Sequence, residues 1–241
     1  MRLTVYNGSP RGVHSNTKVL LSHFLAGFVE TPGNSSEVAY LINRKRSQEH
    51  VRLFGEAEHV LIAFPLYYDS MPAPVKDFIE ELAPFRGRTG NPSLGFIVQS
   101  GFVESIHSLA VERYLARLAV RLGCEYKGTV IRGGGEAIRI VARQRRFLEK
   151  LIFKFSSATD IAGVGHFFDI DGLCDLFYRL GKIFGKTGMF DQKMVSALAG
   201  PRKINRLGYW FAKTAVNTLY WDQMLKSHDA YRQRYSRPYA V

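Results

Sequence analysis

Two hydrophobic periods alternate along the first 138 residues. Short apolar or β-branched runs, typical of strands buried on both faces, occupy residues 2–6, 37–42, 59–64, 94–99 and 126–131. Between them, segments with helical spacing occupy residues 16–29, 47–56, 73–83 and 105–122. This alternation implies right-handed crossovers between parallel strands. We therefore predict a five-stranded, doubly wound α/β domain over residues 1–138, with ligands beyond the carboxyl ends of its strands.

The pattern changes after the glycine run Gly133-Gly134-Gly135. Residues 139–241 contain no convincing strand, and their helical patterns occupy residues 139–156, 172–186, 191–199 and 203–226. The density of aromatic residues in this part argues against disorder. We predict a helical extension, residues 139–241, that packs on the sheet domain and forms a lid or a subunit interface.

Composition narrows the class of protein. The chain has 241 residues, of which 46% are hydrophobic, enough for a packed core. No apolar run approaches the roughly 18 residues of a membrane span, and no secretory signal is evident. The two cysteines, Cys124 and Cys174, suggest neither a disulfide framework nor a metal or iron–sulfur site. A reducing cytoplasm is the expected location.

The positive charge is concentrated in the extension. Residues 1–138 contain 15 Lys and Arg against 13 Asp and Glu, whereas residues 139–241 contain 18 against 8. Such asymmetry occurs in proteins that bind nucleic acid or membrane surfaces. Here the charges are dispersed among apolar helical segments, which favours solvated helix faces or a surface that attracts anionic cofactors. We do not expect a nucleic-acid partner, and contact with a membrane surface is the less favoured alternative.

The most informative segment is the first loop, residues 7–17, between the first strand and the first helix. Its polar groups are the hydroxyls of Ser9, Ser15 and Thr17, the amide of Asn16 and the guanidinium of Arg11. A helix start adds N–H groups and the positive end of a dipole, so the segment suits an anion such as phosphate. Alternatively, Ser15 or Asn16 serves only as a helix cap. Neither the P-loop pattern nor the dinucleotide fingerprint is present.

Two further loops should meet the first at the same edge of the sheet. The second loop, residues 65–74, reads Pro-Leu-Tyr-Tyr-Asp-Ser-Met-Pro-Ala-Pro, and the third loop, residues 100–104, reads Ser-Gly-Phe-Val-Glu. Aromatic faces and accessible backbone beside a phosphate site suit a flat heterocycle joined to a phosphate, which is the form of FMN. A screened helix end contributes only about 0.3–1 kcal/mol, so burial of the ring must supply much of the affinity.

Three motifs in order resemble the flavodoxin-like NAD(P)H-dependent FMN reductases. The resemblance covers residues 1 to about 135. It rests on Asn7-Gly8-Ser9-Pro10-Arg11 with Ser15-Asn16-Thr17, on Pro65-Leu66-Tyr67 through Met71-Pro72-Ala73 with Lys76-Asp77-Phe78-Ile79, and on Gln99-Ser100-Gly101-Phe102.

The resemblance implies a role for each loop. Residues Ser9, Arg11, Ser15, Asn16 and Thr17 would hold the FMN phosphate; Pro65, Leu66, Tyr67 and Tyr68 would border the isoalloxazine; Ser100, Gly101 and Phe102 would line its other edge. FMN would carry the hydride chemistry, with NADPH or NADH as co-substrate and no catalytic side chain or metal. The acceptor would be a quinone, flavin, nitro or azo compound, or a protein. We also predict a homo-oligomer.

Two other functions stay open. The first is a flavodoxin-type electron-transfer protein that does not turn over NAD(P)H, although such proteins are expected to be acidic and compact. The second is a non-enzymatic binding module with basic helices. Among single residues, we expect His107 at the surface, Glu104 as a helix cap or a substrate contact, and Asp169 with Asp171 as a turn and cap rather than metal ligands.

Overall fold

The computed structural model describes residues 1–102, 104–135, 138 and 169–236. Two compact units are distinguished: residues 1–136 with 169–203, and residues 137–168 with 204–241. The first unit contains five strands: β1 (Arg2–Asn7), β2 (Ser35–Tyr40), β3 (His59–Leu66), β4 (Ser93–Ser100) and β5 (Tyr126–Arg132). They form one parallel sheet in the order β2-β1-β3-β4-β5. The predicted fold class is confirmed, with strand ends close to those expected from the sequence.

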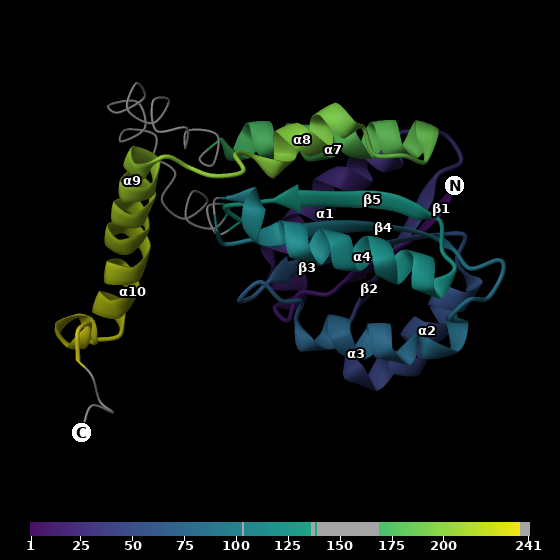
Figure 1. The fold of residues 1–241 in the computed structure, drawn as a ribbon, viewed down its shortest axis with the longest axis horizontal. Helices are drawn as coiled ribbons and strands as arrows, with labels where there is room; N and C mark the ends of the chain where they lie inside the picture. The colour runs from purple at the N-terminus through teal and green to yellow at the C-terminus, as the bar shows by residue number, and fades with distance from the viewer. Residues whose placement is uncertain (103, 136–137, 139–168, 237–241) are drawn as a thin grey trace. The chain divides into compact units, whose positions relative to one another are not determined.

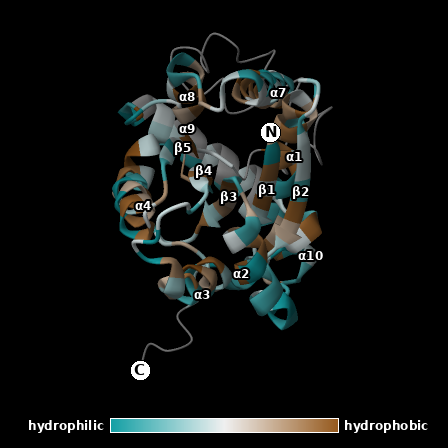
Figure 2. Cartoon of the chain, turned by 90° about the vertical axis from the view of Figure 1, so that its right-hand side faces the viewer, coloured by the Kyte–Doolittle hydropathy of each residue, from teal (hydrophilic) through white to brown (hydrophobic). Residues whose placement is uncertain are grey.

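Helices cover both faces of this sheet (Figure 1). One face carries α2 (Ser47–Glu56), α3 (Ala73–Glu81) and α4 (Leu109–Leu122). The other face carries α1 (Asn16–Phe28), α7 (Ile170–Thr187) and α8 (Gln192–Ala199), and the end-on view in Figure 2 shows the same layers. Burial on both sides explains why the strands read as nearly continuous apolar runs.

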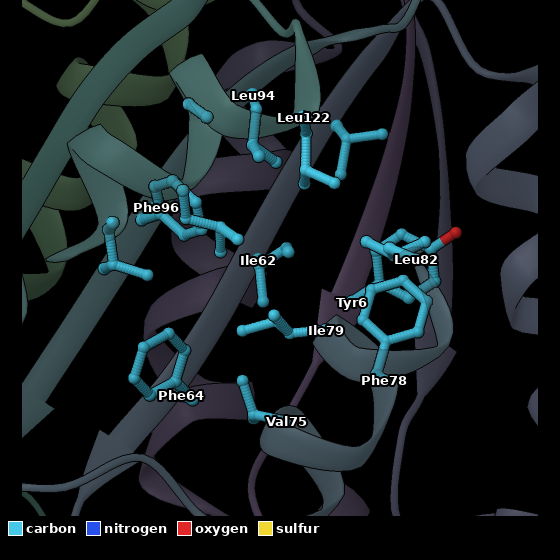
Figure 3. Close-up of a cluster of buried hydrophobic side chains, with 14 of the residues drawn as sticks. Tyr6, Ile62, Phe64, Val75, Phe78, Ile79, Leu82, Leu94, Phe96 and Leu122 are labelled. Carbon is cyan, nitrogen blue, oxygen red and sulfur yellow. The ribbon is translucent and has the colours of Figure 1, made fainter. Parts of the chain in front are cut away.

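A core cluster of buried hydrophobic side chains lies between the sheet and α2, α3 and α4 (Figure 3). Alternate strand residues point into it, including Ile62 and Phe64 of β3 and Phe96 of β4, as the period of two requires. Tyr6 packs against Phe78 with ring centroids 4.5 Å apart, which joins β1 to α3. This face therefore fixes the strand ends from which the loops leave.

On the opposite face, α1 and α7 pack at close range through glycines. A Cβ atom at Gly27 would lie 1.9 Å from the carbonyl oxygen of Tyr178, and one at Gly181 would lie 1.8 Å from that of Phe24. Only glycine allows this approach. Asn34 completes the contact, because its amide donates to the carbonyl oxygen of Phe28 at 3.1 Å and that of Gly185 at 2.9 Å.

The helical extension divides between the two units. The predicted boundary between residues 138 and 139 stays a prediction. The helices α7 and α8, within residues 169–203, belong to the same compact unit as the sheet. The reason is the glycine contact with α1, which no helical periodicity reveals. The helix predicted at 139–156 lies outside the described residues.

The second unit is described by α9 (Arg206–Val216), a π-helical turn (Asn217–Trp221) and α10 (Asp222–Ser227), which follow one another as one rod (Figure 1). The sequence predicted one helix over 203–226, close to this observed extent. In the described ranges, no helix combines the length and apolarity needed to cross a membrane.

Candidate functional site

The three predicted loops leave neighbouring strands at one edge of the sheet. β3 pairs with β1 on one side and with β4 on the other, so the carboxyl ends of these strands lie next to each other. The connection after β1 leads to β2 on one side, whereas the connection after β3 leads to β4 on the other side, so the direction reverses between β1 and β3. Open α/β sheets bind ligands at this topological switch point. The topology therefore brings the first, second and third loops together.

In the first loop, Ser15 begins α1. Its Oγ accepts a hydrogen bond from the backbone N–H of Lys18 at 3.1 Å and donates to the carbonyl oxygen of Gly12 at 2.7 Å. Gly12 has φ of +52°, a left-handed conformation that suits glycine. The hydroxyl proton of Ser15 is thus used within the loop, and the side chain acts as the helix cap that we considered as an alternative.

Asn16 and Thr17 tie the start of α1 to its neighbours. The amide of Asn16 donates to the carbonyl oxygen of Gly135 at 2.7 Å, and the amide of Gln99 donates to Thr17 Oγ1 at 3.3 Å. The N–H of Gly135 donates in turn to the carbonyl oxygen of Ser100 at 2.7 Å. The first helix turn, the end of β4 and the segment after β5 are therefore held together by buried hydrogen bonds.

The glycine run after β5 is part of this arrangement. A Cβ atom at Gly135 would lie 2.0 Å from Gln99 Oε1 and 3.2 Å from the carbonyl oxygen of Ser100. The N–H of Gly134 donates to the carbonyl oxygen of Phe102 at 2.7 Å. In the sequence, this run marked only the point where the pattern of strands and helices changes. The structure instead shows two buried glycines that allow the backbone to approach the third loop.

The groups of the first loop that can still bind an anion are fewer than the sequence suggested. Ser9 Oγ accepts from the N–H of Arg11 at 3.4 Å, and Thr17 Oγ1 accepts from Gln99, so both hydroxyls keep a proton to donate. Within the described ranges, no carboxylate forms an ion pair with Arg11. The loop contains no Asp or Glu. This donor set, with the positive end of α1, fits a phosphate group.

The second loop begins later than predicted. Pro65 and Leu66 still belong to β3, where they pair with Gln99 and Ser100, and both are buried. The Leu66 side chain lies in the core cluster. At this position, only the backbone is available to border a ring, whereas Tyr67 has an exposed side chain.

The tip of the second loop is a tight turn from Tyr67 to Ser70. Their backbones exchange hydrogen bonds at 2.9 and 3.1 Å. The central residues, Tyr68 and Asp69, have φ of 50° and 60°, as in a type I′ turn. A left-handed backbone costs a non-glycine residue about 1–2 kcal/mol. Tyr68 is 99% exposed, so its ring is available to a ligand.

His107 connects the second and third loops. It lies in the 3-10 turn Ser105–Ser108, with Nδ1 3.7 Å from Asp69 Oδ1 and Nε2 3.6 Å from Glu104 Oε2. The Phe102 ring stacks on the imidazole with centroids 4.4 Å apart. From the sequence, we expected His107 at the surface and Glu104 as a helix cap or a substrate contact. The structure places His107 between two carboxylates, and Glu104 makes no side-chain capping bond.

The extension also reaches this edge of the sheet. Arg132 ends β5 and is buried, and its guanidinium donates to the carbonyl oxygen of Leu198 in α8 at 3.5 Å. Burial lowers the pKa of Arg132 to about 10, while Asp169 acts in the opposite direction. Ser105 donates from its N–H to the carbonyl oxygen of Pro201 at 3.0 Å, so the segment after α8 supports the turn that carries His107.

Asp169 has a structural role at the start of α7. Its carboxylate accepts from the N–H of Gly172 at 2.8 Å, which confirms the predicted helix cap. Among the residues that the structure describes, no group of three or more His, Cys, Asp or Glu side chains is placed to hold a metal ion.

Comparison with known proteins identifies solved structures that share this fold. No protein-family model and no curated protein matches the chain. Three solved structures each align with a TM-score of 0.52: azoreductase AzrA, an azoreductase from Bacillus anthracis str. Sterne, and an NAD(P)H:quinone oxidoreductase from Methanothermobacter marburgensis. The chain shares their flavodoxin-like fold.

The alignments are long but the sequences are distant. The two azoreductases are 16% and 15% identical to the chain and align over 76% of it and 100% of their own lengths. The quinone oxidoreductase is 14% identical and aligns over 78% of this chain and 98% of its own. The resemblance seen in the motifs is confirmed at the level of fold. The ligand contacts of the site residues stay predictions.

Proposed function

We propose that this chain is an FMN-dependent NAD(P)H oxidoreductase that reduces a small acceptor, such as a quinone or an azo compound. The observation that carries the proposal is the junction of three loops at the carboxyl ends of β1, β3 and β4, where a carboxylate-free anion loop lies beside exposed aromatic rings. The names of the similar structures, two azoreductases and a quinone oxidoreductase, support the class of reaction.

The phosphate of FMN would be bound by Arg11, by the hydroxyls of Ser9 and Thr17, and by N–H groups at the start of α1. Ser15 would contribute by fixing the helix start, since its hydroxyl proton is already donated to Gly12. A hydrogen bond to a charged group contributes about 1.5–3 kcal/mol and a helix end about 0.3–1 kcal/mol. Micromolar affinity requires about 8 kcal/mol, so ring contacts must supply the rest.

The isoalloxazine would lie against the backbone of Leu66 and the exposed rings of Tyr67, Tyr68 and Phe102. When bound there, FMN would supply the chemistry of hydride transfer from a nicotinamide to an acceptor. The task of the protein is to orient the ring and to keep water from one side of it. His107, which lies between Asp69 of the second loop and Glu104 of the third, would help to keep these loops in position for that task.

The visible spectrum of the purified chain tests the proposal directly. We expect flavin absorption, or its appearance after titration with FMN, followed by bleaching when NADH or NADPH is added without oxygen. A retained flavin that neither nucleotide bleaches would favour the flavodoxin-type electron-transfer protein. Absence of any affinity for FMN would contradict both functions and favour the binding module.

Matched variants test the assignment of the phosphate site. Arg11→Ala should weaken FMN binding by about 10- to 100-fold, the loss of one charge-assisted bond, and leave riboflavin binding unchanged. Arg121→Ala removes the same charge from an exposed position at the end of α4 and should affect neither ligand. Equal losses for FMN and riboflavin in Arg11→Ala would show that Arg11 supports the ring site instead.

Three related statements belong to the proposal: a cytoplasmic location, a homo-oligomeric state and a small-molecule acceptor. An exposed flavin edge is commonly completed by a second subunit, and sedimentation of the FMN-loaded chain measures the oligomeric state. Turnover assays with quinones, azo dyes and free flavin, each with NADH and with NADPH, identify the acceptor class and the preferred nucleotide.

A further inference from the structure

Both tryptophans of the chain are exposed on one helical rod of the second unit. The sequence contains two, Trp210 in α9 and Trp221 at the end of the π-helical turn. Their exposed fractions are 62% and 49%, and Tyr209 beside Trp210 is 60% exposed. Large aromatic side chains that gather on a surface mark interaction sites more often than solvated faces. The exposed rings therefore indicate that this helix contacts a partner.

Helical geometry brings the three rings to one side of the rod. Tyr209 and Trp210 are neighbours, and α9 continues without a break through the π turn to Trp221 (Figure 1). About three turns, one of them widened by its π hydrogen bonding, return the chain to the side that Tyr209 and Trp210 share. We call this side, defined by Tyr209, Trp210 and Trp221, the aromatic face.

Basic residues share the aromatic face. Arg206 lies one turn before Trp210, and Lys213 lies one turn after it, so both project on the same side of α9. Both side chains are exposed. α9 contains no acidic residue, and residues 202–234 contain seven Lys and Arg against two Asp. The surface is thus aromatic and positively charged.

We propose that the aromatic face binds the surface of an anionic lipid bilayer. Tryptophan and tyrosine rings concentrate at the level of lipid headgroups, where one end of the ring is apolar and the other is hydrated. Lys and Arg side chains near a membrane surface are attracted to anionic headgroups, and their long stems let the charge reach the headgroups beside the rings. Arg206 and Lys213 would contact lipid phosphates while Trp210 and Trp221 enter the headgroup layer.

Two other partners fit the aromatic face less well. A two-fold contact with a second copy would apply the same patch to itself and bring Arg206 and Lys213 toward their equivalents, with no acidic residue of α9 to pair with them. Single-stranded nucleic acid is usually held in a groove lined by many cations. The outward side of a single helix with two cations on it offers no such groove.

The two tryptophans make the test specific, because all tryptophan emission of the full chain comes from the aromatic face. The purified chain is mixed with vesicles of phosphatidylglycerol, or of phosphatidylcholine alone. We expect co-sedimentation and a blue shift of emission with the anionic vesicles only, and quenching by acyl chains brominated near the headgroup. Raising the salt concentration should weaken binding, because exposed charges are screened.

Matched variants separate rings from charges. Trp210→Ser/Trp221→Ser should lower the partition coefficient at least tenfold, whereas Tyr114→Ser, which removes an exposed ring from α4, should leave it unchanged. Arg206→Gln/Lys213→Gln should lower it by about tenfold and reduce its salt dependence. Lys45→Gln/Arg121→Gln removes the same charge from exposed sites of the sheet domain and should have little effect.

Specific results would overturn the proposal. They are an unchanged emission spectrum with anionic vesicles, or binding that the double tryptophan variant retains in full. Self-association that depends on Trp210 and Trp221, without vesicle binding, would identify a second copy as the partner. Tight oligonucleotide binding that excludes vesicles would identify nucleic acid. Each readout is independent of flavin reduction, so it does not depend on the proposed redox function.

Discussion

The first and second loops meet at the same edge of the sheet but are held in opposite ways. In the first loop, buried side chains hold the backbone: Ser15 caps α1 from within the loop, and Asn16 and Thr17 bond to distant parts of the chain. The second loop has an exposed tip, and its shape depends on a left-handed backbone at Tyr68. The proposed phosphate site is therefore shaped by tertiary contacts, and the proposed ring site beside it is shaped by a strained turn. Substitutions in the first loop should therefore lower the stability of the protein more than substitutions at the tip of the second loop.

Of the substitutions that test this difference between the loops, Gly8→Ala in the first loop should change the free energy of unfolding most. A Cβ atom there would lie 2.2 Å from Val75 Cγ2 and 3.1 Å from Phe64 Cβ, inside the packed core. Overpacking should lower the free energy of unfolding by about 2–3 kcal/mol, measured by urea denaturation. Gly33→Ala is the control, since its Cβ meets no atom within 4 Å and only its φ of +82° opposes the change. Equal losses would contradict steric control of the first loop.

A smaller effect is expected from loss of the helix cap. Ser15→Ala removes the acceptor of the Lys18 N–H and should cost about 1 kcal/mol of stability. Ser22→Ala, in the middle of α1 and exposed, removes a hydroxyl without a cap and should not destabilise the protein. If Ser15→Ala weakens FMN binding far more than it weakens folding, Ser15 is a direct phosphate ligand instead.

In the second loop, a substitution should stabilise the protein. Tyr68→Gly relieves the left-handed strain and should raise the free energy of unfolding by about 0.5–1 kcal/mol. Tyr68→Ala keeps the strain and removes the same ring, so its stability should match the original. Both variants should weaken FMN binding equally if the ring contacts the flavin. If both variants were more stable than the original, the exposed ring, and not the left-handed backbone, would be the source of the destabilisation at Tyr68.

The smallest effect is expected where the second loop joins the third. His107→Gln removes the contacts with Asp69 and Glu104, which are long and partly exposed, so stability should change by less than about 0.5 kcal/mol. Hydrogen exchange is the sharper measurement, with faster exchange expected for the amides of Tyr67 and Ser70. Unchanged exchange would mean that the turn holds its shape by its own two hydrogen bonds.

The sequence predicted the sheet, its order of elements and the meeting of three loops, because buried parallel strands and amphipathic helices have clear periods. It could not predict contacts that depend on distances between loops. Gln99, Gly135 and His107 received no clear role for this reason, although an unusual run of three glycines marked one of them. Leu66 was assigned to a loop because the strand pattern gives no sharp end where a proline follows.

The packing of α7 against α1 was the other feature that the local sequence pattern could not predict. Its periodicity predicted a helix but not its neighbour. The approach of α7 to α1 depends on Gly27 and Gly181, which look unfavourable within helices when each is considered alone. The two glycines allow close packing only because the helices meet at these positions, and the sequence of either helix alone does not show this.

The contact between α1 and α7 joins segments that are made at different times on the ribosome. All five strands emerge before residue 170, while the side of α1 that carries Phe24 and Phe28 still lacks the Phe184 ring that will cover it. Nascent chains with such bare apolar surfaces are prone to aggregate and to recruit chaperones. A chain that ended between β5 and α7 would therefore have a complete sheet with a bare apolar face on α1, and it should aggregate more readily than the full chain.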